Sequence, residues 1–329
     1  MAYSGTVSQT RFTTRRVIDN AVRRCRIPAQ QITSEHIDIA NDQLYLLLSD
    51  LSNKGIQLWC IEKLLMPIYD GAANVTLPVG TVDILNSNLR TMSEVTGTNT
   101  DTATRRTIEF DSVTFVTTVG VLWSAVSAPL SFERSDDGVT WDTIQTEDDP
   151  VAVAGEWSWF DMASSVATTF FRVTATTGTL DYDTLYVANN PSSIPLSRMN
   201  RDQYTNLPNR AFQSNRPLQF WYNRVIPQPI MVLWPVPDAQ ATTSLLEVWR
   251  QRHIMDVGSM TQEIEVPQRW YMALVTMLAA AMAREIVEVD PKLVPQLDAD
   301  AAAALYSAQM EERDNSPIMI APNISMYSR

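Results

Sequence analysis

Histidine, cysteine and glycine are scarce in this sequence, and their scarcity excludes several kinds of chemistry. The chain has 2 histidines, 2 cysteines and 10 glycines in 329 residues. No P-loop, GxGxxG, GxSxG or HExxH pattern occurs, so the usual loops for phosphate groups, the serine nucleophile and the zinc-protease helix are missing. We therefore expect a protein that is not an enzyme and needs no cofactor.

The few histidines and cysteines stand apart from one another. His36 and His253 have no cysteine or carboxylate cluster at metal-ligand spacing, which favours a structural role for both. Cys25 and Cys60 lack a CxxC partner and lie in apolar surroundings. This pattern predicts buried, reduced thiols and an intracellular site of synthesis.

Acidic pairs at Asp136-Asp137 and Asp148-Asp149 are the remaining candidates for a cation site. Carboxylate and carbonyl oxygens on one loop can bind Ca²⁺. Aspartate is also a common turn residue, and a turn role is the stronger expectation here. We expect no metal site, with cation binding at these turns as the alternative.

Long apolar runs are absent as well. The longest, at 271–283 within WYMALVTMLAAAMARE, is shorter than the roughly 20 residues of a transmembrane helix. The N-terminal MAYSGTVSQTRFTTRR lacks the apolar stretch of a signal peptide. We expect synthesis in the cytoplasm and no membrane partner.

Basic charge is in deficit, with 25 Lys and Arg against 37 Asp and Glu and a net charge of −12. Binding to nucleic acid over the whole surface is therefore not expected, because phosphate contacts depend on clustered basic residues. Solubility is the plainest interpretation, and an acidic lining past which DNA slides is the alternative. The one basic cluster spans residues 11–26 and includes Arg15, Arg16, Arg23 and Arg24. It is either a solvated helix face or a surface for an acidic partner or a DNA backbone.

Helical periodicity is strongest near the two ends of the chain. Apolar residues recur at spacings of three and four after a capping Thr or Ser in the first two segments. Pro267 and Asp290-Pro291 are placed to begin two further helices, the last one bent at Pro295. The predicted helices cover 13–27, 34–55, 196–207, 267–285 and 290–313.

The middle of the chain has the pattern of strands. A polar, Thr-rich stretch at 93–104 is typical of a linker. Residues 105–190 alternate in short runs between turn signals, which predicts an antiparallel β-sandwich. Within it, SFERSDDGVTWDTI predicts a hairpin that turns at Asp137-Gly138.

These patterns predict an α+β protein with an inserted domain. Residues 1–92 and 191–313 form a discontinuous helical core with a small β-region, 105–190 form the inserted sandwich, and 314–329 an extended tail. Within the core, RPLQFWYNRVIPQPIMVLWPVPD at 216–238 reads as a hairpin whose prolines lie at the strand margins and discourage further strand pairing.

Four segments together resemble the head-to-tail adaptor proteins of tailed phages. This family is best known from short-tailed phages. The four segments are ANDQLYLLLSDLSNKGIQLWCIEK, the proline-bracketed hairpin, the strand LLEVWRQRHI, and VPQRWYMALVTMLAAAMARE. The resemblance implies a structural virion protein of the neck that forms a ring, usually of twelve copies, beneath the portal. Its implied partners are itself, the portal, the tail tube, nozzle or fibres, and passing genomic DNA bound without sequence specificity.

The C-terminal tail SPIMIAPNISMYSR is similar in character to the extension with which such adaptors reach the portal. An apolar tail that cannot fold alone is buried only on a partner, so its ordering is coupled to assembly. The candidate portal contacts are its apolar side chains Ile318, Met319, Ile320, Ile324, Met326 and Tyr327.

The predicted sandwich offers an alternative function. SFERSDDGVTWDTI and FFRVTAT loosely resemble discoidin-like and carbohydrate-binding sandwiches, and the rings of Trp141 and Trp157 suit a sugar platform. Strand alternation places Trp157 and Trp159 on one face of the sheet, where core packing is the commoner outcome. Carbohydrate binding by a virion protein is thus the competing hypothesis.

Overall fold

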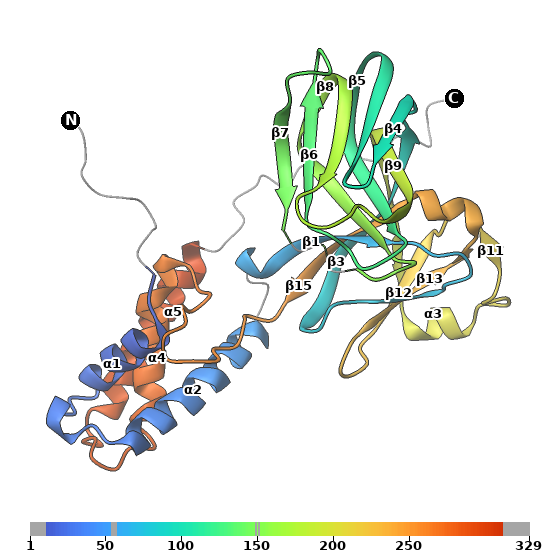
Figure 1. Ribbon diagram of the computed structural model, residues 1–329. Helices are drawn as coiled ribbons and strands as arrows, with labels where there is room; N and C mark the ends of the chain where they lie inside the picture. Colours follow the sequence, from blue (N-terminus) through green and yellow to red (C-terminus); the bar gives the residue numbers. More distant parts are fainter. Residues whose placement is uncertain (1–10, 54–57, 149, 151, 312–329) are drawn as a thin grey trace. The chain divides into compact units, whose positions relative to one another are not determined.

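The computed structural model describes residues 11–53, 58–148, 150 and 152–311 (Figure 1). The chain divides into two compact units. Met1–Ile61 and Arg252–Arg329 belong to the helical unit, and Glu62–Gln251 belong to the β unit. The mixed α+β class expected from the sequence is confirmed, with helices and a large antiparallel β-sandwich in one chain.

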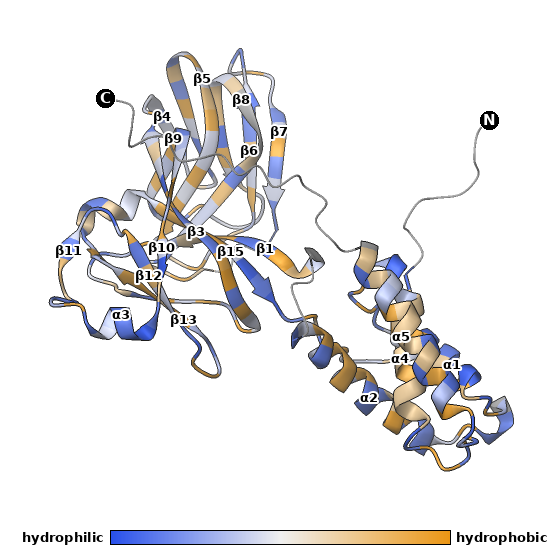
Figure 2. Cartoon of the chain, turned by 180° about the vertical axis from the view of Figure 1, so that it is seen from behind, coloured by the Kyte–Doolittle hydropathy of each residue, from blue (hydrophilic) through white to orange (hydrophobic). Residues whose placement is uncertain are grey.

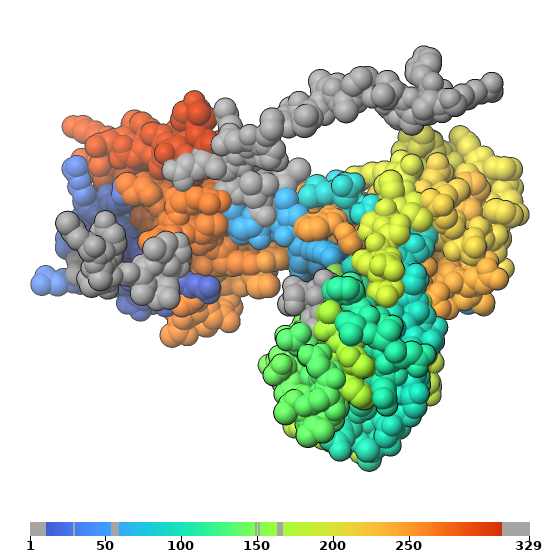
Figure 3. Space-filling view, turned by 90° about the horizontal axis from the view of Figure 1, so that it is seen from above, coloured from blue at the N-terminus to red at the C-terminus, as the bar shows by residue number. Residues whose placement is uncertain are grey.

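The helical unit packs around one central helix. Helix α4 (Tyr271–Met282) is apolar on every side, and Met272 is its one exposed side chain among the described residues. The other three helices, α1 (Thr14–Arg24), α2 (Ser34–Asn53) and α5 (Val294–Glu311), pack against it. The surfaces of α4 and α5 adjoin closely in space-filling view (Figure 3). In Figure 2, α4 is coloured apolar along its length, whereas α2 alternates between polar and apolar residues.

Local sequence signals explain the helix ends. The Thr13 hydroxyl accepts a hydrogen bond from the Arg16 N–H and caps α1, so Thr13, and not Thr14, is the cap of the two that the sequence offers. The last helix begins later than expected, because residues 290–293 form a turn in which the Asp290 carboxylate accepts from the N–H of Lys292. Pro295 then lies in the first turn of α5, where its missing N–H costs little. The prediction of a longer helix bent at Pro295 is therefore wrong.

The large sheet of the β unit is built around its longest strands. Strand β5 (Arg105–Trp123) pairs antiparallel with β8 (Trp157–Ala175) on one side and β9 (Tyr182–Pro195) on the other. The core of this sheet contains Trp123 of β5, Phe171 of β8 and Phe132 of the neighbouring strand β6. Order across the sheet is β1-β15-β3-β9-β5-β8-β6-β7, with β4 paired to β5. The remaining strands are β1 (Ile61–Pro67), β3 (Thr81–Glu94), β4 (Thr98–Thr102), β6 (Leu130–Ser135), β7 (Asp142–Glu147) and β15 (Leu245–Arg252).

A smaller sheet in the same unit contains the proline-bracketed segment. Strands β12 (Gln219–Asn223) and β13 (Ile230–Trp234) form the predicted antiparallel hairpin, with Phe220 opposite Leu233. The phenol of Tyr222 donates to the carbonyl oxygens of Thr81 and Val82, at 2.9 and 3.1 Å. Strand β10 (Ser197–Met199) pairs with β12, and β2 (Asn74–Thr76) pairs with β13, so the expectation that the prolines discourage further strand pairing is wrong. Short β11 (Gln213–Ser214) pairs with β14 (Val236–Pro237).

Short helical turns connect these elements. Helix α3 (Arg201–Thr205) begins with a capping box in which Asn200 and Gln203 bond each other's backbone N–H groups. It lies within the predicted helix at 196–207, although the structure makes only its second half helical. The 3₁₀ turns are Ala29–Gln31, Leu58–Cys60, Ala239–Thr243 and Gln268–Trp270.

The boundaries of the inserted part differ from those expected. Residues 105–190 are not a separate domain, because β9 pairs along β3 and the hairpin core shares Ile84 and Leu246 with the large sheet. The stretch 93–104 is not a linker, because β3 extends to Glu94 and β4 pairs with β5. All five residues of β4 are exposed, so its polar composition reflects an edge strand. A discontinuous helical part remains, but it consists of residues up to 61 and from 252 onward.

No helix in the described ranges is long and apolar enough to cross a membrane.

Candidate functional site

Two of the four arginines of α1, Arg23 and Arg24, line a hollow in the helical unit. Arg15 forms an exposed salt bridge with Asp19 at 3.1 Å. The guanidinium of Arg16 lies 4.4 Å from the ring centroid of Phe12, which is stacked in turn on Tyr271. In the part of the chain that the structure describes, no carboxylate forms a salt bridge with Arg16, or with Arg23 and Arg24 further along α1.

The hollow has a volume of about 490 Å³ and combines apolar walls with cationic edges. Met272 is 57% exposed there, and its sulfur lies 3.1 Å from the Arg24 Nη2. We call this hollow the basic groove. It is lined by Phe12, Asn20, Arg23, Arg24, Tyr271, Met272 and Val275.

The side of helix α2 that faces away from the helical core is negatively charged. The buried positions of α2 include Leu44 and Leu48, and the outward positions recur at spacings of three and four on the other side. None of the carboxylates on this face has a salt-bridge partner among the described residues. We call this surface the acidic face, and it consists of Glu35, Asp38, Asp42, Tyr45 and Leu46.

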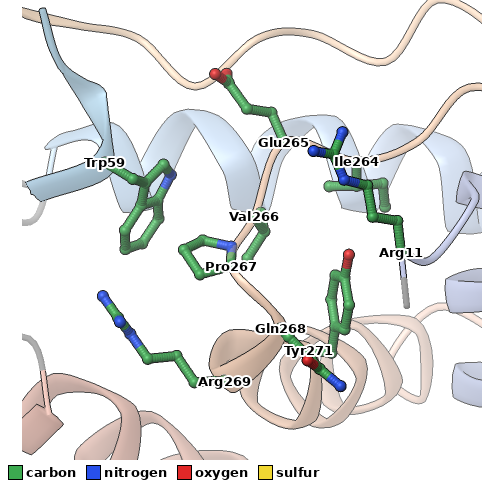
Figure 4. A pocket seen from close by; sticks show the side chains of 9 residues that line it. All are labelled: Arg11, Trp59, Ile264, Glu265, Val266, Pro267, Gln268, Arg269 and Tyr271. Carbon is green, nitrogen blue, oxygen red and sulfur yellow. The ribbon is translucent and has the colours of Figure 1, made fainter. Parts of the chain in front are cut away.

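A second hollow in the helical unit, of about 730 Å³, has the side chains shown in Figure 4 around it. Burial alone would raise the pKa of Glu265, but the hydrogen bonds from Arg252 and the Met255 N–H outweigh it and lower the pKa. Glu265 is therefore an ionised partner of Arg252.

In the helical unit, His36 and Cys25 both pack in structural roles. The His36 Nδ1 accepts from the Thr33 N–H at 3.3 Å, and its Nε2 lies 3.3 Å from a Glu288 oxygen. Cys25 is buried as expected, and burial raises the pKa of its thiol to about 11. No group of three or more His, Cys, Asp or Glu with metal-binding geometry occurs in the described residues.

In the β unit, the Asp137 carboxylate organises the turn between β6 and β7. It accepts from the N–H groups of Val139 and Thr140 at 2.9 and 2.8 Å, and from the hydroxyls of Thr140 and Ser135. These bonds hold the pKa of Asp137 far below its usual value, the Thr140 N–H contributing most. The carboxylate is thus committed to the turn. Only Gly138 of the expected pair has a positive φ, at 72°.

This turn places Trp141 beside a polar groove. The Arg172 guanidinium lies 4.0 Å from the Trp141 ring centroid and is ion-paired to Glu133, its neighbour across the β6–β8 pairing. We call this hollow, of about 450 Å³, the tryptophan groove. It is lined by Thr98, Thr100, Thr102, Arg105, Thr107, Glu109, Gly138, Val139, Trp141, Phe170 and Arg172.

Trp157 belongs to a different part of the β unit, so the two tryptophans do not form one platform. It stacks on Trp159 with ring centroids 5.0 Å apart, and both pack near Tyr186 and Leu245. Arg172, whose guanidinium packs on the Trp141 ring, lies 15 positions after Trp157 on strand β8. At about 3.3 Å per residue that separation amounts to tens of ångströms along the strand. The joint platform of Trp141 and Trp157 is therefore wrong, and Trp157 is a packing residue.

Sequence reasoning missed Arg172, the threonines of β4 and the acidic face. The tryptophan groove depends on the register between β6 and β8 and on the edge strand β4, which its polar composition had assigned to a linker. The acidic face could have been found, because Asp38, Asp42 and Leu46 recur at helical spacing opposite the apolar stripe. The six tail residues that were candidate portal contacts lie outside the described residues.

Comparison with known proteins gives distant similarities among solved structures. No family profile and no curated protein matches the chain. Among solved structures, a glycoside hydrolase matches with 12% identity and a TM-score of 0.22 over 26% of this chain, and the match spans only 20% of that protein. An F5/8 type C domain from Bacteroides fragilis matches with 11% identity and a TM-score of 0.24, over 31% of this chain and 90% of its own.

A third match is CBM32-1 from a family 31 glycoside hydrolase of Clostridium perfringens. It has 9% identity and a TM-score of 0.22, over 41% of this chain and 98% of its own. Similarities at this level carry no argument about function.

Proposed function

We propose that this protein is a structural, non-enzymatic component of a tailed-phage particle. In this role, copies assemble as a ring in the neck, between the portal and the tail. The ring extends the DNA channel and provides a platform for tail attachment, and the C-terminal tail docks on the portal.

The observation that carries this proposal is how the adaptor-like segments fold. ANDQLYLLLSDLSNKG belongs mostly to α2, and RWYMALVTMLAAAMARE contains α4. Although the whole β unit separates them in the sequence, these two helices pack together in one compact unit. Insertion into a connection leaves such a host core intact, which supports an assembly unit that carries an additional β unit.

The charge distribution agrees with this role. A net charge of −12 suits a wall past which DNA moves without tight binding. The cations of α1 are gathered on one helix, where they can contact an acidic partner or a phosphate backbone without attracting DNA over the whole surface.

The experiment is electron microscopy or mass measurement of the full chain mixed with its portal protein. We expect ring-shaped complexes that contain both proteins. Recovery of the chain as a monomer beside free portal, at every concentration tested, contradicts the proposal.

A second candidate function is carbohydrate binding in the tryptophan groove. Trp141 presents a half-buried indole beside Arg172 and the hydroxyls of β4, and a sugar can use both aromatic stacking and hydrogen bonds. A glycan array with the full chain tests it. Reproducible binding lost in Trp141→Ala but kept in Trp249→Ala, a change on β15, supports this function, and an array without signal contradicts it.

A further inference from the structure

We propose that the helical unit joins copies of this chain head to tail, the acidic face of one copy seated in the basic groove of the next. The inference rests on the proposed function, because a ring supplies a second copy as the neighbour. The inference adds to the proposed function the two surfaces through which neighbouring copies contact each other.

Charge is the first argument. Arg23 and Arg24 border the groove, whereas Asp38 and Asp42 lie on the outward side of α2. Among the described residues neither group is neutralised by a salt bridge within its own chain. Unpaired charges of opposite sign on two surfaces of one molecule provide electrostatic complementarity between copies.

The apolar residues on the two surfaces also complement each other. Tyr45 and Leu46 are each 55% exposed beside the carboxylates of α2. Met272, at 57% exposed, lines the groove beside Arg24. Aromatic residues, Met and Arg are enriched in protein interfaces, and a flexible Met side chain adapts to a partner. Each surface therefore has an apolar centre bordered by charge.

The same charges decide the symmetry of the contact. Groove against groove would bring arginines together, and acidic face against acidic face would bring carboxylates together; both arrangements repel. Only groove against acidic face is attractive. That contact is heterologous, and a heterologous contact closes into a ring when its rotation divides a full turn.

The two surfaces are placed so that a second copy can reach each of them. Helices α1 and α2 pack against α4, which lies between them in Figures 1 and 2. The charged side chains occupy the positions on α1 and α2 opposite to the buried stripes. One helix face in one groove buries less than the roughly 1,000 Å² of a stable complex, so a single contact is weak and ring closure strengthens it.

Thiol cross-linking tests the contact in the full chain. The native thiols Cys25 and Cys60 are 2% and 1% exposed, so an introduced exposed cysteine is the reactive site. Leu46→Cys and Met272→Cys proteins are mixed and treated with a short bismaleimide. We expect covalent dimers to form on the order of tenfold faster than in a mixture of Leu46→Cys with Arg216→Cys, an exposed control site on the β unit. A chain carrying both groove and face cysteines should give a ladder of larger products.

Charge reversal identifies the contact further. Arg23→Glu in the Met272→Cys chain should lower the cross-linking rate about tenfold, and Asp42→Arg in the Leu46→Cys partner should restore it. Asn20→Cys serves as a second groove site if Met272→Cys unfolds, as checked by circular dichroism.

Cross-linking at the rate of the Arg216→Cys control, or a rate that charge reversal leaves unchanged, overturns the inference. Rings on the portal without this cross-linking overturn the inference alone and leave the proposed function standing. Cross-linked ladders without any portal-bound ring support the contact and contradict the adaptor role.

Discussion

At the residue scale, ion pairs inside the β unit make its stability depend on pH. The Asp161 carboxylate accepts from Arg90 at 2.6 Å and from Lys63 at 2.8 Å. Burial alone would raise the pKa of Asp161, but these two cations outweigh it and lower the pKa. A carboxylate whose folded pKa is lowered stabilises the fold above its unfolded value, about 4, and this contribution is lost as the pH falls through the folded pKa.

We therefore predict that Asp161→Asn lowers stability at pH 7 and flattens the decline in stability below about pH 4. Urea midpoints measured from pH 7 to pH 2 check this. Asp183→Asn is the matched control, because Asp183 is exposed and has no ion-pair partner among the described residues. Equal pH profiles for Asp161→Asn and the native chain would contradict the assignment.

Burial of Trp270 gives a second residue-scale prediction. Its side chain is 1% exposed and packs edge-on against Trp59, with ring centroids 5.1 Å apart. Trp270→Ala should destabilise the helical unit by about 3–5 kcal/mol, because it removes apolar contacts and leaves a cavity. Thermal unfolding measures the loss, and Trp249→Ala, at a position 38% exposed, should cost much less.

At the scale of elements, the sequence predicts helices better than strand partners. The periods of α1, α2 and α4 are local, so caps and apolar spacing locate them. The partners of β3 and β4 lie far along the chain, and composition alone assigned β4 to a linker. Distant strand partners also explain why the sequence did not predict the tryptophan groove. The aromatic residue Trp141 was named from the sequence, but its partner Arg172 is set by strand register.

Close approach of β5 to β8 makes Gly120 necessary. A Cβ atom at this position would lie 2.6 Å from the Trp159 ring, which is held by its stacking on Trp157 and its contact with Tyr186. We predict that Gly120→Ala destabilises the β unit by about 1–3 kcal/mol through overpacking. Chemical denaturation followed by tryptophan fluorescence measures the change. The double variant Gly120→Ala/Trp159→Phe should recover part of it, whereas an unchanged Gly120→Ala midpoint would contradict the packing argument.

At the scale of the whole molecule, the protein combines a helical unit from both chain ends with an inserted β unit. The sequence predicts a discontinuous helical part, but it places the boundary too far into the β unit. Polar composition at 93–104 resembled a linker, and no local signal shows that the hairpin near residue 220 shares a core with β3 and β15. Long-range packing decided that boundary.

The C-terminal tail supplies a prediction at this scale. Replacing Ile318, Met319 and Ile320 with Ser should abolish portal attachment and leave the thermal stability of the free chain unchanged, because the proposal buries these side chains only on the partner. Replacing Ser325 and Ser328 with Ala is the control. Co-sedimentation with the portal measures attachment, and full binding by the serine-substituted tail would contradict the docking role.

The central claim is that copies of this chain form a ring between portal and tail. Cryo-electron microscopy of the particle neck tests it most directly, because the helical unit and the β unit have distinct shapes that can be fitted separately. We predict a closed ring of identical copies beneath the portal, with α1 of each copy against α2 of the next. A neck without this chain, or with single unconnected copies, would contradict the account.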